Sequence, residues 1–149
     1  MTLSPDNTLL LDSILPYSRY MQRTLASEPA LEDALVQHMQ QAFSEQEMLE
    51  FLRTPMVTNE AELHRLLRQL RKRVMLRLLS RDLTGLADLN EVMLTMTALA
   101  ETTIHFSLEL HHAWLADPAR YGAPIGEKTG ADQQLLVVAM GKLGGKELN

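Results

Sequence analysis

A stripe of apolar residues between positions 63 and 78 is the feature that most constrains the fold of this chain. Its members lie on one side of a helical wheel: Leu63, Leu66, Leu67, Leu70, Val74 and Leu78. Asn59 and Glu62 precede the stripe with the spacing of a capping box, and Gly85 suits the left-handed position that follows a helix. The sequence therefore predicts one long amphipathic helix that ends near Thr84.

A second long helical pattern follows almost at once. Asp88 and Glu91 again have capping-box spacing. The residues behind them recur at steps of mostly three and four: Val92, Met96, Leu99, Thr103, Phe106, Leu110 and Trp114. Pro118 is expected to end this helix. Two long amphipathic helices joined by a short turn predict an antiparallel pair at the centre of a mainly α fold.

Shorter helices are expected before this pair. The dipeptide Ser4-Pro5 is typical of a helix start, and Pro16 should stop or kink the helix that it opens. A break is expected before Pro29, because the residue that precedes a proline avoids helical geometry. Helices should lie on both sides of that break. Ser44 has a glutamate three positions later, which predicts a further short helix.

The sequence changes character after position 118. Residues 119–133 contain three glycines and a proline and are typical of a surface loop. Residues 135–140 are apolar and rich in β-branched side chains, which predicts a buried β-strand. A lone strand leaves its backbone groups unpaired, so we expect the rest of its sheet to lie in a longer protein. The expected division is a helical N-terminal subdomain (1–118), a loop (119–133), and a strand with a glycine-rich turn (134–149).

Composition argues against several classes of protein. There is no cysteine, so no disulfide or thiolate metal site can form. No apolar stretch approaches the roughly 20 residues that span a bilayer, and the first residues do not resemble a secretory signal. The net charge of −5 argues against a general nucleic-acid binder, which depends on phosphate contacts. We therefore expect a cytoplasmic protein that binds neither membranes nor nucleic acid.

Charge is unevenly distributed along the chain. Residues 63–81 contain seven basic and no acidic side chains, whereas residues 1–62 and 82–149 are both acidic. Arg65 and Arg68 lie opposite the apolar stripe on the helical wheel. They are therefore the better candidates for an outward, partner-binding role.

Three further arginines fall on or beside the apolar stripe: Arg73, Arg77 and Arg81. A buried charge without a partner is costly, so these side chains need one. One interpretation pairs them with Glu91, Glu101 or Asp82 in an ion-pair network between helices. The other has them facing an acidic partner or nucleotide phosphates. The first interpretation is favoured.

Four polar residues of the second long helix share one face: Glu101, His105, Glu109 and His112. Imidazole and carboxylate groups at this spacing can in principle hold a metal ion. Polar residues repeated turn by turn also describe an ordinary solvated helix face. The second interpretation is favoured, and no metal site is expected.

A glycine-rich turn, residues 141–146, directly follows the predicted strand. Glycines let backbone N–H groups approach phosphate oxygens, and lysines add positive charge. The Walker pattern is excluded, because it needs glycine at Met140 and serine or threonine at Glu147. The dinucleotide fingerprint needs a different glycine spacing. By itself the turn is compatible with a phosphate site or with a plain tight turn.

Longer strings carry a family resemblance. Leu135 to Asn149, LLVVAMGKLGGKELN, closely resembles the segment that leads into the active site of the glutamine synthetase adenylyltransferase family. Bifunctional members of this family attach AMP to glutamine synthetase and remove it. Leu67 to Leu89, LRQLRKRVMLRLLSRDLTGLADL, resembles the N-terminal half of the same family. The resemblance is close from Leu63 onwards and looser over the first sixty residues.

The resemblance implies a fold and a site. The family belongs to the nucleotidyltransferase superfamily, so residues 134–149 would begin an α/β nucleotidyltransferase domain. Its candidate nucleotide- or phosphate-binding residues are Gly141, Lys142, Gly144 and Gly145. The resemblance also implies ATP or ADP and Mg²⁺ in the full-length enzyme, with the metal held by an Asp-x-Asp pair on a second strand. That pair should lie beyond Asn149, so no catalytic residue and no cofactor are expected in this piece.

The arginine-rich helix and the Met-Gly-Lys-Leu-Gly-Gly string are more similar to the half that removes AMP from a tyrosine of glutamine synthetase by phosphorolysis. The chain would then be an inactive piece of a multifunctional transferase of nitrogen metabolism. Glutamine synthetase and a PII-type signalling protein are the expected partners. The candidate partner-facing or ion-pair residues are Arg65, Arg68, Arg73 and Arg77. The alternative is a non-catalytic helical module that docks one of these two proteins.

Overall fold

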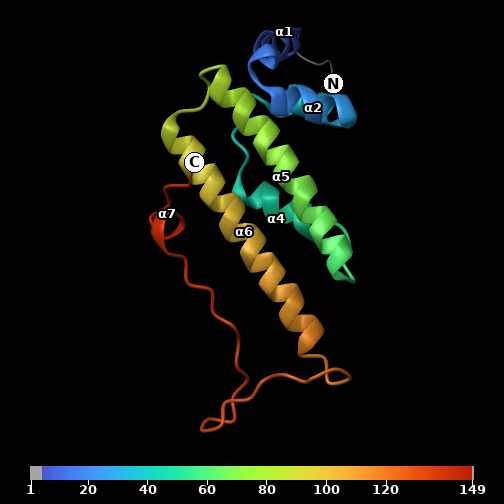
Figure 1. Ribbon diagram of the computed structural model, residues 1–149, viewed down its shortest axis with the longest axis vertical. Coiled ribbons are helices and arrows are strands. Elements are labelled where there is room, and N and C mark those ends of the chain that lie inside the picture. The colour runs from blue at the N-terminus through green and yellow to red at the C-terminus, as the bar shows by residue number, and fades with distance from the viewer. Residues whose placement is uncertain (1–4, 149) are drawn as a thin grey trace.

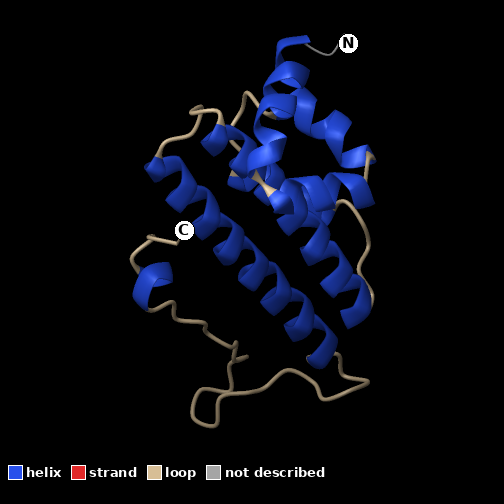
Figure 2. Cartoon of the chain, turned by 45° about the horizontal axis from the view of Figure 1, so that its top comes forward, coloured by secondary structure: helices blue, strands red, loops and turns tan. Residues whose placement is uncertain are grey.

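The computed structural model describes residues 5–148, and its folded part consists of helices (Figures 1 and 2). In chain order these are α1 (Pro5–Ile14), a 3-10 turn η1 (Leu15–Tyr17), α2 (Arg19–Ser27), α3 (Ala30–His38), α4 (Glu45–Arg53), α5 (Glu60–Leu83), α6 (Leu89–Leu115) and α7 (Gly141–Gly144). Within residues 5–148 there is no β-strand, and one isolated bridge joins Ile125 to Asp132. The mainly α fold is therefore as expected.

Helix starts follow the capping residues of the sequence. The side chains of Ser44, Asn59 and Asp88 accept hydrogen bonds from the backbone N–H of the third helical residue, at 3.2, 3.0 and 2.7 Å. These interactions satisfy N–H groups that have no partner inside their own helix. The predicted starts of α4, α5 and α6 are confirmed, whereas Ser4 lies outside the described residues.

Helix ends also follow local rules. Gly85 has φ of +72° directly after α5, a left-handed conformation that costs glycine least. Glu28 is extended, with φ of −138°, and separates α2 from α3, as its position before Pro29 predicts. Helix α3 stops at His38, whereas the spacing of apolar residues predicts a helix from Pro29 to about Gln41.

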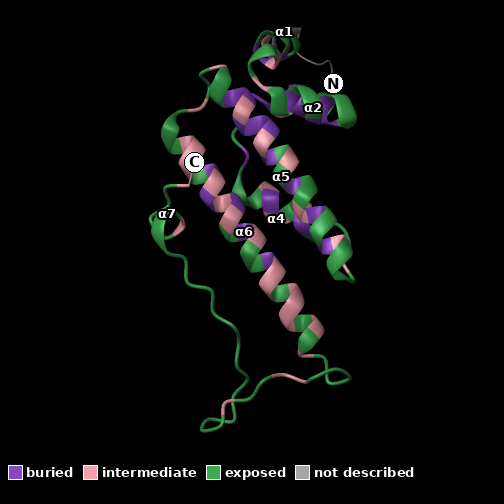
Figure 3. Cartoon of the chain, in the orientation of Figure 1, coloured by how far each residue is buried: buried purple, intermediate pink, exposed green. Residues whose placement is uncertain are grey.

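Helix α5 is the element shared by two apolar cores. The first core is formed by α1, α2 and α3 together with Leu76 of α5. The second core lies between α4, α5 and α6 and includes Leu70 and Val74 of α5, with Leu99 and Phe106 of α6. Burial of these side chains removes apolar surface from water on both sides of one helix. Figure 3 shows the buried residues gathered along α5 and the faces packed on it.

Helices α5 and α6 lie side by side, and the chain reverses direction at the turn that contains Gly85 (Figures 1 and 2). Helix α6 also packs against α4, so the second core has three walls. Helix α6 extends beyond the start of α5 (Figure 1), and Leu110 and Trp114 in its last turns are partly buried and pack against the second core.

Arg81 joins three parts of the fold. Its guanidinium donates two hydrogen bonds to the carboxylate of Glu91 in α6, at 2.6 and 2.8 Å. It also donates to the carbonyl of Met39 after α3 and to the carbonyl of Leu86 in the turn, at 3.1 and 3.2 Å. The bonds to Glu91 raise the pKa of Arg81 above its ordinary value, against the opposing effect of burial. Arg81 therefore stays charged and fixes how α6 leaves α5.

The predicted strand at residues 135–140 is wrong for the described structure. This segment runs back along α6 without strand pairing (Figures 1 and 3). Leu136, Val138 and Met140 are 85, 80 and 82% exposed. The physical reason is that no neighbouring strand in residues 5–148 offers partners for the backbone groups of this segment. The expected first strand of an α/β domain is thus not formed here.

We predict that Arg81→Met lowers the free energy of unfolding by about 3 kcal/mol, because it leaves the Glu91 carboxylate without its charged partner. Urea denaturation monitored by circular dichroism measures this loss. Arg65→Met is the matched control, since Arg65 is exposed on the same helix, and it should change stability by no more than about 0.5 kcal/mol. Equal effects of the two substitutions would contradict the role assigned to Arg81.

A hydrogen-bonded carboxylate in the first turn of α5, that of Glu62, predicts that the stability of the protein depends on pH. Glu62 accepts hydrogen bonds from the backbone N–H and the hydroxyl of Thr58, both at 2.9 Å. These bonds lower the pKa of Glu62 below its ordinary 4.5. Its contribution to stability is therefore complete above pH 4.5 and is lost as the pH falls through the lower folded-state pKa. An NMR titration should show this carboxyl protonating below 4.5, and Glu62→Gln should flatten the acid limb of the stability curve.

Candidate functional site

The glycine-rich turn is a single helical turn on the surface. Helix α7 spans Gly141–Gly144, and Gly141 begins it with φ of +60°. The N–H of Gly145 donates to the carbonyl of Gly141 at 2.9 Å, and the N–H of Glu147 donates to the carbonyl of Lys142 at 2.7 Å. Lys142 is exposed. The turn is therefore held together by its own backbone.

At two positions of this turn the backbone itself requires glycine. Gly141 adopts a positive φ that other residues rarely adopt. A Cβ atom on Gly144 would lie 2.7 Å from the carbonyl oxygen of Ala139, which is closer than atoms in contact allow. At Gly145 the nearest atoms would lie at 3.5 Å, an ordinary contact distance. The glycine pattern thus partly reflects how tightly the turn packs on residue 139.

Phosphate binding by this turn has a structural requirement. The N–H groups of Gly144 and Gly145 donate to the carbonyls of Met140 and Gly141, at 3.4 and 2.9 Å. A phosphate oxygen that accepted hydrogen bonds from both N–H groups would have to replace these two backbone hydrogen bonds. The longer of them, at 3.4 Å, is weak. Lys142 and Lys146 are the positively charged residues of the turn, and both are exposed.

The arginines of α5 divide into two groups. Arg65, Arg68 and Arg71 are exposed, and none of them forms an ion pair with a carboxylate within the described residues. The other basic residues of the helix are engaged: Lys72 pairs with Glu28, and the side chains of Arg73, Arg77 and Arg81 contact α4 or α6. Arg73 is exposed but lies over the ring of Phe51. Arg65, Arg68 and Arg71 therefore remain as a group of three exposed arginines that have no ion pair within the described residues.

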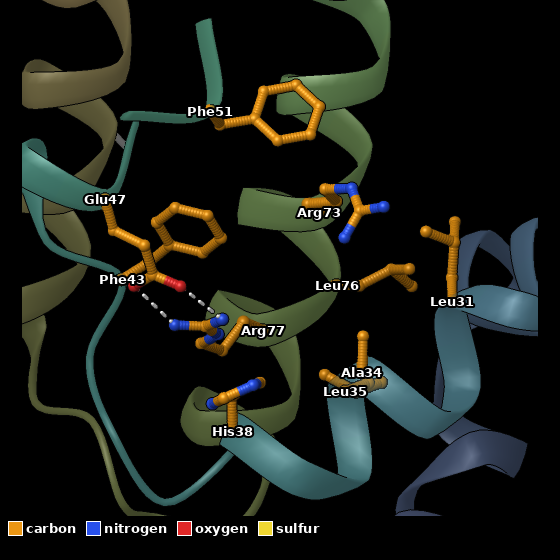
Figure 4. Close-up of a pocket in the computed structure, with 10 residues that line it drawn as sticks. All are labelled: Leu31, Ala34, Leu35, His38, Phe43, Glu47, Phe51, Arg73, Leu76 and Arg77. Carbon is orange, nitrogen blue, oxygen red and sulfur yellow. Dashed lines mark hydrogen bonds and ion pairs between the residues drawn. The ribbon is translucent and has the colours of Figure 1, made fainter. Parts of the chain in front are cut away.

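Arg77 is buried between α4 and α5, with 7% of the residue exposed. Its guanidinium donates two hydrogen bonds to the carboxylate of Glu47, both at 2.8 Å, and lies over the ring of Phe43 at 4.1 Å from the centroid (Figure 4). Both interactions favour a charged guanidinium in a partly apolar setting. The sequence predicted other acceptors, because the helical wheel says nothing about which helix lies opposite. Arg81 does use Glu91, one of the predicted acceptors.

A cavity of about 160 Å³ lies beside Arg77, between α3, α4 and α5 (Figure 4). It is lined by Leu31, Ala34, Leu35, His38, Phe43, Glu47, Phe51, Arg73, Leu76 and Arg77. Arg73 lies over the ring of Phe51, with its guanidinium carbon 5.2 Å from the centroid. Sequence spacing gave no sign of this site, because its walls come from three helices. We call it the α3–α5 pocket.

The polar face of α6 forms no metal centre. His105 and Glu109 approach to 3.0 Å, and both side chains are largely exposed, at 64 and 49%. Within residues 5–148 no three His, Asp or Glu side chains lie close enough together to hold a metal ion. The arrangement is that of an exposed i, i+4 pair on a solvated helix face.

A bilayer-spanning helix is not found in the described part of the chain, since none of its helices combines the necessary length and apolarity. The longest helix, α6, carries polar residues throughout its length.

Comparison with known proteins adds independent information. A family model described as glutamate-ammonia ligase adenylyltransferase matches residues 9–149. A protein of Nitrosomonas europaea is 63% identical over 142 residues, which cover 94% of this chain and 15% of that protein. Proteins of Aromatoleum aromaticum and Chromobacterium violaceum are 47 and 41% identical, each over 89% of this chain and 14% of their own length. No solved structure matches the chain.

All three relatives carry the same description, bifunctional glutamine synthetase adenylyltransferase/adenylyl-removing enzyme. The chain spans about 15% of the length of these relatives. The match includes most of the first sixty residues, where the sequence resemblance was looser. It also includes the glycine-rich turn and the arginine-rich helix α5.

We predict that Gly144→Ala opens the α7 turn, because the new methyl group would collide with the Ala139 carbonyl at 2.7 Å. Amide hydrogen exchange at residue 145 should accelerate, and the ¹³Cα shifts of residues 141–144 should move toward random-coil values. Gly145→Ala is the matched control, because its methyl group meets nothing closer than 3.5 Å. Unchanged exchange in Gly144→Ala would show that the turn does not pack as described.

Proposed function

Because this chain belongs to the glutamate-ammonia ligase adenylyltransferase family, we propose that it is part of an enzyme that attaches AMP to glutamine synthetase and removes it. The observation that carries the proposal is the 63% identity over 94% of the chain to a protein described as having both activities. The family model matches residues 9–149, a range that includes α5, α6 and the glycine-rich turn. The remaining length of the relatives would supply the rest of the catalytic apparatus.

Within this enzyme we assign the chain to the half that removes AMP. That half uses inorganic phosphate to cleave the bond between AMP and a tyrosine of glutamine synthetase, and it releases ADP. The assignment is supported by the arginine-rich lead-in and by the Met-Gly-Lys-Leu-Gly-Gly string at residues 140–145. Both resemble the N-terminal copy of the catalytic unit more than the C-terminal copy.

Residues 134–149 are proposed to begin the nucleotidyltransferase domain of that half. The exposure of Leu135, Leu136 and Val138, at 68, 85 and 80%, supports this, because apolar side chains in water are unfavourable unless something covers them. The segment already has an extended backbone without regular secondary structure. Neighbouring strands of the same domain would pair with its backbone and bury its side chains.

The chain's own residues fit a nucleotide better than a metal. Gly141, Lys142, Gly144 and Gly145 form an exposed turn that can approach phosphate oxygens once the 3.4 Å hydrogen bond of Gly144 is released. For Mg²⁺ the fit fails, because residues 5–148 offer no cluster of carboxylates and imidazoles. The carboxylates that hold the metal with ATP or ADP are therefore proposed to lie elsewhere in the enzyme. Residues 1–149 alone should be inactive.

Partner binding is the second function that an observation favours. Arg65, Arg68 and Arg71 are exposed on one helix and carry no ion pair within the described residues. Such a group suits an acidic surface of glutamine synthetase or of a PII-type signalling protein. On this alternative the helices are a non-catalytic docking module. Either role would be exercised in the cytoplasm, where glutamine synthetase is expected.

The proposal predicts which activity depends on the glycine-rich turn. In the full-length enzyme, Lys142→Ala should slow the phosphate-dependent release of AMP by roughly tenfold or more, because a positive charge beside the transferred phosphate is lost. Attachment of AMP, measured with ATP and unmodified glutamine synthetase, should be unchanged. Radiolabelled AMP on glutamine synthetase serves both assays.

Lys128→Ala is the matched control, because Lys128 lies in the exposed loop before the apolar segment. It should leave both activities unaltered. If Lys142→Ala instead slowed the attachment of AMP, the chain would belong to the other half. If neither activity changed, the turn would have no part in the chemistry, and the docking alternative would gain.

A further inference from the structure

The α3–α5 pocket carries a charge that its own walls do not balance. Arg77 is paired with Glu47 by two hydrogen bonds of 2.8 Å. Arg73 also lines the pocket, but within residues 5–148 no carboxylate forms an ion pair with it. The pocket therefore has a net positive charge at Arg73. An anionic group is the natural complement.

The position of Arg73 is fixed by an aromatic neighbour. Its guanidinium carbon lies 5.2 Å from the centroid of Phe51 in α4, within the range of a cation–π contact. Figure 4 shows Phe51 and Arg73 together at one end of the pocket and His38 at the other. Because Arg73 is exposed as a residue, an anion bound to it lies at the mouth and keeps part of its hydration. The planar guanidinium matches the two oxygens of a carboxylate.

Part of the pocket wall is apolar, although His38, Glu47 and Arg77 also line the pocket. Leu31 and Leu35 of α3 and Leu76 of α5 belong to this apolar part, and each of these leucines is at most 8% exposed. Charged oxygens in contact with such walls would lose hydration without gaining hydrogen bonds. A fully charged ion such as phosphate is therefore a poor occupant of this inner part. A short hydrocarbon chain is a good one.

We propose that the α3–α5 pocket binds a small monocarboxylate with a short apolar chain, its carboxylate on Arg73 and its chain against the three leucines. The cavity of about 160 Å³ sets the size of the ligand. A dry cavity of about 150 Å³ in another protein accommodates benzene, so about seven heavy atoms fit. Neither the proposed transfer of AMP nor the docking alternative uses this pocket, so its ligand is an additional property of the protein.

Isothermal titration of the full-length protein with isovalerate tests the proposal. Isovalerate has one carboxylate and a branched apolar end, and it should bind at one site. Arg73→Gln should weaken binding by roughly tenfold or more, because a charge-assisted pair is lost. Arg65→Gln removes an arginine of the same helix that does not line the pocket, and it should leave the dissociation constant unchanged.

A second variant tests the apolar part without touching the charge. Ala34 lines the pocket on α3 and is only half-buried, so Ala34→Met should fill the cavity and abolish isovalerate binding while the helices persist by circular dichroism. Acetate, which lacks the branched end, should bind more weakly by roughly tenfold or more. No heat of binding with isovalerate, or equal affinity in Arg73→Gln, would overturn the proposal. If inorganic phosphate bound at Arg73 as tightly as isovalerate, the proposal that the ligand carries an apolar chain would be overturned.

Discussion

Two ion pairs between α5 and the first turns of its neighbours determine how the helices are arranged. Arg77 binds Glu47 in α4, and Arg81 binds Glu91 in α6. Both glutamates occupy the third position of their helix, from which a capping-box carboxylate usually returns to its own N-cap backbone. Here the N-cap side chains still accept their hydrogen bonds, while the carboxylates reach across to α5. Each pair therefore fixes where a neighbouring helix begins relative to α5, and the second apolar core lies between the three helices that the pairs join.

The same two pairs explain what the remaining cations of α5 are available to do. Burial of Arg77 and Arg81 on the packed side leaves Arg65, Arg68 and Arg71 exposed in water. Arg73 lies between these groups: its ring contact with Phe51 holds it at the edge of the α3–α5 pocket. One helix thus carries fixed structural charge, solvent-exposed charge and a charge at a pocket. Net charge alone would not have separated these three environments.

Much of the helical architecture could be predicted from local sequence, because caps and breakers act over a few residues. Ser44, Asn59, Asp88 and Gly85 mark helix boundaries that the structure confirms. Contacts between distant residues could not be predicted in this way: Arg77 and Glu47 are 30 positions apart, and the α3–α5 pocket draws on three helices. The strand at residues 135–140 was predicted wrongly, because its composition satisfies the local rule while its pairing depends on strands that residues 5–148 do not provide.

We propose that the helical unit held by the arginines of α5 carries an apolar segment, residues 135–140, that becomes ordered only within a larger domain. Hydrogen–deuterium exchange, compared between residues 1–149 alone and the full-length enzyme, tests it most directly. We predict that amides of α5 and of the first turns of α4 and α6 are equally protected in both proteins. Residues 135–140 should exchange rapidly in the short chain and become strongly protected in the long one. Equal exchange of that segment in both proteins would contradict the account.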